Sequence, residues 1–134
     1  MWKMLIIIGC FCLAACAVSR EAMMKADYGP RPSNAEAVKK TTTYLEQILI
    51  EPDSLRLGCS LDMRRGWARD SFFDDPVFGW LIRCKVKAKY SLNGYTSNKD
   101  YVFVVNGPNV FGLELSRDID VQRDLTYLFM GYAD

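Results

Sequence analysis

Residues 80–90 read WLIRCKVKAKY, a segment in which hydrophobic and basic side chains alternate. Successive side chains of an extended strand point to opposite faces, so this period of two predicts a strand that is buried on one face only. The set predicted to face inward is Trp80, Ile82, Cys84, Val86, Ala88 and Tyr90. The basic residues of the opposite set are Arg83, Lys85, Lys87 and Lys89. Such a strand favours an antiparallel sheet with one covered face.

Three further segments predict strands of the same sheet. Hydrophobic residues alternate with polar ones over residues 55–61, which places Cys59 on the inward-facing side. A turn sequence at residues 91–94 precedes residues 99–105, which are rich in aromatic and β-branched side chains. The sequence NGPN at residues 106–109 then turns the chain into residues 110–115. We therefore expect about four strands.

Helical periodicity flanks these strands on both sides. The sequence SNAE at residues 33–36 is a capping box, and hydrophobic residues then recur every three or four positions until Pro52 ends the helix. A second helix is predicted over residues 118–132, where Val121, Leu125 and Tyr132 share a helical spacing. Residues 63–76 show no period and predict a long loop. The expected fold is α+β: an N-terminal amphipathic helix packed on an antiparallel sheet, with a C-terminal helix.

The first sixteen residues have the plan of an exported lipoprotein precursor. One lysine precedes the apolar run 5–13, which is typical of a signal peptide and shorter than the roughly 20 residues of a membrane-spanning helix. The sequence LAAC at residues 13–16 resembles the lipobox of bacterial lipoproteins. That resemblance implies cleavage after residue 15 and acylation of Cys16 by diacylglycerol and a fatty acid such as palmitate. The alternative is an ordinary signal peptide that contains cysteine.

The chain is accordingly divided into a signal peptide (residues 1–15), a lipidated tether (residues 16–32) and a single α+β domain (residues 33–134). Residue 17 is alanine. In lipoproteins of this type an aspartate beside the acylated cysteine signals retention in the inner membrane, so the resemblance favours the outer membrane. Two prolines and a glycine within residues 28–32 exclude a regular helix or a central strand at the end of the tether.

Cysteines 59 and 84 are the only two that remain after processing and acylation. Both fall on inward-facing positions of predicted strands, and an even pair in an exported domain is the usual pattern of a disulfide. The alternative is two buried free thiols.

Composition argues against several classes of function. The chain has 134 residues, 17 basic and 16 acidic residues, and no histidine. It therefore has no histidine for a catalytic triad or a metal site, and no basic excess of the kind that nucleic-acid binding requires. Phosphate-binding glycine motifs are absent, and Asp70, Asp74 and Asp75 lack the spacing of a calcium loop. We expect no enzyme activity, no cofactor and no metal.

Two groups of residues are candidates for binding a partner. The basic row Arg83, Lys85, Lys87 and Lys89 could contact lipid phosphates, an anionic polysaccharide or an acidic partner, although a solvated sheet face is the favoured interpretation. The aromatic residues of the predicted loop are Trp67, Phe72 and Phe73. They could form a partner-binding loop, although a loop folded over the core is the more common arrangement.

The chain resembles a group of small bacterial lipoproteins of unknown function. The resemblance rests on the lipobox and on short motifs: YGP at 28–30, IEPDS at 50–54, GW at 79–80 and NGYT at 93–96. It implies an envelope location and a one-domain α+β fold, and it assigns no site residues. We expect a non-enzymatic, lipid-anchored protein at the periplasmic face of the outer membrane that binds or assembles with another envelope protein. The alternative is an enzyme inhibitor or immunity-type lipoprotein that inserts its loop at residues 67–75 into a cleft. The sequence does not indicate an oligomeric state.

Overall fold

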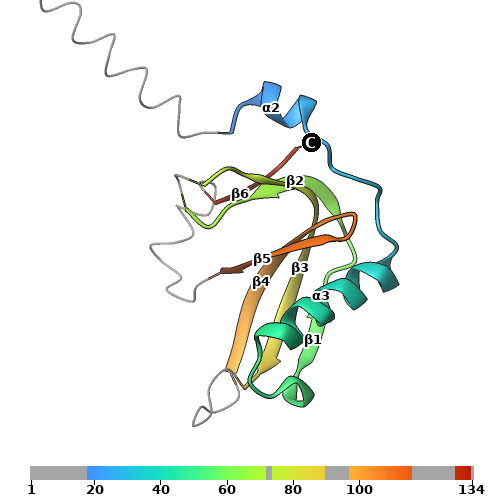
Figure 1. Ribbon diagram of the computed structural model, residues 1–134, viewed down its shortest axis with the longest axis vertical. Helices are drawn as coiled ribbons and strands as arrows, with labels where there is room; N and C mark the ends of the chain where they lie inside the picture. Colours follow the sequence, from blue (N-terminus) through green and yellow to red (C-terminus); the bar gives the residue numbers. More distant parts are fainter. Residues whose placement is uncertain (1–17, 72–73, 90–96, 116–128, 134) are drawn as a thin grey trace, which may run out of the picture.

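A computed structural model describes residues 18–71, 74–89, 97–115 and 129–133 of the chain. It has an α+β fold in which a six-stranded antiparallel sheet carries a helix on one face (Figure 1). The helical elements are α2 (Arg20–Lys25), α3 (Asn34–Ile48) and the short 3-10 helix η1 (Pro52–Ser54). The strands are β1 (Arg56–Cys59), β2 (Arg64–Ala68), β3 (Val77–Ala88), β4 (Ser97–Asn106), β5 (Asn109–Leu115) and β6 (Met130–Tyr132). The expected fold class is confirmed, and the expected strand count of about four is corrected to six.

Strand β3 organises the sheet. The strand order is β5-β4-β3-β2-β6, and β1 pairs with β3 beside β2. The edge of β3 opposite β4 is therefore shared by two short strands: Cys59 of β1 lies across from Cys84, and Arg64 of β2 lies across from Leu81. Because β4 occupies the other edge over Trp80–Ala88, both backbone edges of β3 are used. The long alternating segment is thus the centre of the sheet.

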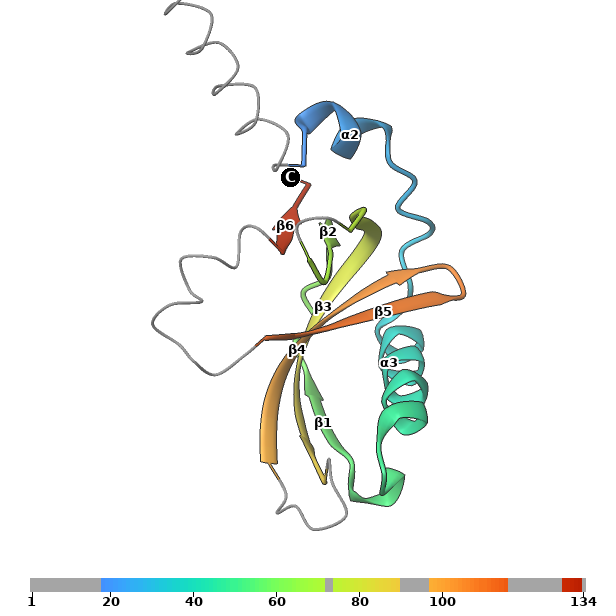
Figure 2. The same ribbon diagram turned by 60° about the vertical axis from the view of Figure 1, so that its left-hand side comes forward.

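Helix α3 covers one face of this sheet, as the two views show (Figures 1 and 2). Its N-terminus is capped by Ser33, whose Oγ accepts a hydrogen bond from the backbone N–H of Glu36 at 3.2 Å. The buried residues of the helix are Ala37, Thr41 and Leu45. Ala37 and Leu45 belong to the same hydrophobic core as Ile82 and Phe103 of the sheet. Thr41 is fully buried, and its hydroxyl donates to the carbonyl of Val38 at 2.9 Å, which satisfies the polar group.

The face of the sheet opposite α3 has two different halves. Toward β6 it carries a second hydrophobic cluster that includes Leu81, Val102 and Val104, which are almost fully buried. Toward β1 the same face carries Arg83 and its basic neighbours, which are exposed. The expectation that only one face of the sheet is covered is therefore wrong for this apolar half.

Three expectations about local structure need correction. Residues 64–68 of the predicted loop form β2, because they pair with β3 on one side and β6 on the other. Residues 130–132 are a strand, so the predicted C-terminal helix is wrong at its end, while residues 116–128 lie outside the described residues. The tether contains a short helix, α2, that the sequence pattern did not indicate; Ser19 caps it by accepting a hydrogen bond from Ala22 N.

Candidate interaction surface

The end of the tether is bound to the sheet rather than free. Tyr28 is only 8% exposed, and its ring meets the edge of Phe78 with 5.9 Å between the centroids. The indole Nε1 of Trp80 donates to the carbonyl of Gly29 at 3.1 Å. The side-chain amide of Asn106 donates to the carbonyls of Asp27 at 2.7 Å and Phe78 at 3.0 Å. We call this set of contacts the linker dock.

Glycine is required at position 29 for two reasons. Its φ angle is +70°, a conformation that side-chain-bearing residues rarely adopt. A Cβ atom there would also lie 2.5 Å from Oδ1 of Asn106, the residue whose amide holds the tether. Tyr28 and Gly29 of the YGP motif are therefore the residues whose side chain and conformation fit the tether onto the sheet.

Replacing Gly29 by alanine should cost about 1–3 kcal/mol of unfolding free energy and loosen the tether, because the new Cβ pushes Asn106 away. Denaturant unfolding measures the free energy, and hydrogen exchange of residues 20–28 measures the loosening. Gly58→Ala is the matched control, since Gly58 has negative φ and no atom within 4 Å of the added Cβ. Equal effects of the two substitutions would contradict the role of the linker dock.

An exposed group of basic side chains lies on the sheet face opposite α3. Because alternate residues share a face, Arg83, Lys85 and Lys87 point away from the buried Cys84 and Val86. Arg56 of β1 lies directly across from Lys87 and joins them on that face. These four residues, all exposed, are the basic surface. Lys89, the last residue of the predicted row, does not belong to it, because its Nζ pairs with Oε1 of Glu51 at 3.1 Å.

Among the described residues, little negative charge faces the basic surface. Asp100 of β4 lies across from Lys85 and is its one acidic neighbour in the β3 register. Within the described ranges, no carboxylate oxygen lies within 4.0 Å of the charged groups of Arg83, Lys85 or Lys87. By contrast, Lys99 on the other face pairs with Glu114 at 3.2 Å. In the described part of the structure the exposed cations of β3 therefore have no acid pairing, which suits a solvated sheet face and equally a surface that binds an acidic partner.

The aromatic candidates separate into two groups. Trp67 belongs to β2 and is only 6% exposed, with the Arg69 guanidinium 5.3 Å from the ring centroid. The prediction that it lies in a loop is wrong, because Trp67 is a strand residue paired with Gly131 of β6, and its burial agrees with the more common arrangement of packing against the core. Phe72 and Phe73 lie outside the described residues. A Trp67→Ala variant would consequently report on folding before it reported on binding.

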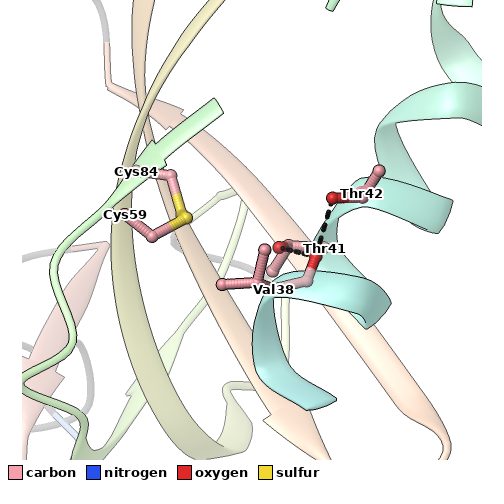
Figure 3. Close-up of a disulfide and its surroundings, with 5 residues drawn as sticks. All are labelled: Val38, Thr41, Thr42, Cys59 and Cys84. Carbon is pink, nitrogen blue, oxygen red and sulfur yellow. Dashed lines mark hydrogen bonds between the residues drawn. A yellow bond between two sulfur atoms is a disulfide. The ribbon is translucent and has the colours of Figure 1, made fainter. Parts of the chain in front are cut away.

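The predicted disulfide is confirmed between Cys59 and Cys84, 25 residues apart in sequence. The two residues face each other across β1 and β3, with 4.0 Å between their Cα atoms. Figure 3 shows the bridge beside the turn of α3 that carries Val38 and Thr41. The bridge thus fixes β1, and with it Arg56, against the strand that carries the rest of the basic surface.

Potential metal ligands, membrane-spanning helices and similarity to known proteins bear on the remaining predictions. No group of three or more potential metal ligands occurs among the residues that the structure describes. In the same ranges no helix is long and apolar enough to cross a membrane. Cys16 lies outside them. No family model, curated protein or solved structure matches the chain.

Proposed function

We propose that this protein is a non-enzymatic lipoprotein of the cell envelope, anchored through Cys16 at the periplasmic face of the outer membrane, and that it binds another envelope protein. The anchor itself is supported by the LAAC sequence and the preceding apolar run. The observation that carries the binding role is the basic surface, a set of four exposed cations with one acidic neighbour among the described residues that pair with β3.

The linker dock supports this proposal by keeping the domain close to its anchor. Ten residues separate Cys16 from Asp27, and six of them form α2. Six helical residues rise about 9 Å, and the remaining extended residues add at most about 17 Å. The domain then stays within about 26 Å of the acylated residue, which raises its effective concentration for partners at the same membrane.

Crosslinking in intact cells tests the proposal. The acylated protein, purified from detergent-solubilised membranes after crosslinking, should carry one or a few defined envelope proteins. Recovery of the uncrosslinked protein alone would contradict a binding role. Recovery with a single soluble hydrolase would instead support the inhibitor alternative.

A further inference from the structure

We infer that the basic surface binds an acidic segment of a protein partner that lies along β3. This inference rests on the proposed binding role and adds the chemistry of the partner. The surface comprises Arg83, Lys85 and Lys87 in a single row, with Arg56 beside the last of them.

The spacing of the row matches that of carboxylates on regular protein segments. Alternate residues of a strand are about 6–7 Å apart, so the three cations of β3 span about 13 Å. Glutamates four positions apart on a helix are separated by about 6 Å along its axis. Alternate residues of an extended segment have the same spacing as the row itself. An acidic segment of either kind can therefore place one carboxylate at each cation.

The contact must be made by side chains rather than by strand addition. Both edges of β3 at this point are occupied, by β4 on one side and β1 on the other. Charge complementarity is then the main source of recognition. A single exposed ion pair contributes little binding energy. Several together speed the encounter of the two proteins and fix the position of the acidic segment along β3. Binding should be modest in affinity and should weaken as salt is added.

The position of the surface argues against the anchoring bilayer as its ligand. The linker dock contacts Phe78 and Trp80, whereas the cations of β3 lie three to seven residues further along the strand, roughly 10–23 Å away. Their side chains also leave the sheet on the face opposite Trp80. Figures 1 and 2 both place α2 beyond one end of the sheet and β1 toward the other. The tether thus joins the described domain at the end of the sheet near α2, and the cations are presented toward the end near β1.

The test uses the acylated full chain in neutral detergent and a fluorescent alanine-rich helical peptide with glutamates every four residues. The wild-type protein should bind this peptide at low salt, and R83E/K87E should weaken binding by at least about tenfold. The matched control is R20E/K39E, which makes the same change in net charge at exposed positions of α2 and α3. The control should bind within about twofold of wild type, because these side chains lie outside the row. The neutral variant R83Q/K87Q should fall between wild type and R83E/K87E.

Equal loss in the two charge-reversal variants would overturn the inference, as would absence of peptide binding. Circular dichroism of each variant verifies that it is folded. The lipid comparison measures the preference of the acylated protein for vesicles that contain phosphatidylglycerol over neutral phosphatidylcholine vesicles, because its acyl chains insert into both. If the peptide does not bind and R83E/K87E abolishes the preference for phosphatidylglycerol, the surface recognises lipid phosphate and the inference is overturned while lipid anchoring stands. Failure of the in-cell crosslinking would instead remove the proposed binding role.

Discussion

A Cys16→Ser variant is expected to yield no acylated product, and the mature protein should then leave the membrane fraction almost completely. The thioether requires the cysteine sulfur, and each buried methylene of an acyl chain contributes about 0.8 kcal/mol, so losing all chains removes the whole anchoring energy. Membrane fractionation measures the shift, and mass spectrometry of the N-terminal peptide identifies the acyl chains on the wild-type protein.

The fractionation experiment must distinguish the loss of acylation from a failure of signal-peptide cleavage. An uncleaved precursor of the Cys16→Ser variant would keep the apolar run 5–13 and could stay on the membrane through it. A second form of the variant therefore carries an ordinary cleavable leader in place of residues 1–15, and its mature product should be soluble. Cys12→Ser is the control, because residue 12 lies in the segment removed by cleavage and its loss should leave membrane attachment unchanged. Mass spectrometry that finds an unmodified Cys16 in the wild-type protein would contradict the anchor and the proposed function together.

Local periodicity was sufficient to predict the centre of the fold. The alternation is found in β3 over residues 80–88, while Tyr90 lies outside the described residues, and the alternation over residues 55–61 contains β1. Each pattern put its cysteine on the inward-facing side, and the structure places Cys59 directly across from Cys84. A half-buried strand repeats its burial every two residues, so its signal lies within a short stretch of sequence.

Strands β2 and β6 could not be predicted in the same way, because their stability comes from distant partners. Gly66 interrupts the pattern of residues 64–68, and an added Cβ there would clash with the backbone carbonyl of Gly131. A glycine inside a strand can mark such a close backbone approach, but the sequence does not say which segment approaches. The end of the tether was expected to drape over the fold, but its partners in the linker dock could not be predicted for a related reason: its hydrogen bonds join Trp80 and Asn106 to backbone carbonyls, which carry no residue signature.

The sequence pattern predicted which residues of β3 belong to the basic surface, but not whether acidic residues neutralise them. Spacing alone indicated that Arg83, Lys85 and Lys87 share a face. Whether acids neutralise them depends on the register with β4 and β1, which no local pattern contains. The register adds Arg56 to the surface, and the ion pair with Glu51 removes Lys89 from it. Charge neutralisation is thus a property of the tertiary structure.

Replacing both Cys59 and Cys84 by alanine is expected to lower the free energy of unfolding by about 3 kcal/mol, the chain-entropy value for a loop of about 25 residues. For a domain of this size the melting temperature should then fall by roughly 12–24 °C. Thermal and denaturant unfolding of the variant and the oxidised wild type measure this loss. The wild type reduced by dithiothreitol is the control, and it should show a similar loss without any substitution.

The loss of amide protection from hydrogen exchange should also differ between strands. This difference distinguishes the effect of removing the disulfide from that of a general packing defect. Strand β1 has four residues and pairs with β3 alone among the described strands, whereas β4 pairs with both β3 and β5. Without the bridge, the amides of β1 and η1 should exchange with solvent well before those of β4, because short edge strands open locally. Arg56 would move with β1, so acidic-peptide binding should weaken slightly even under conditions where the rest of the domain stays folded. A destabilisation below about 1 kcal/mol, or equal loss of protection in β1 and β4, would show that pairing with β3 holds β1 in place without the disulfide.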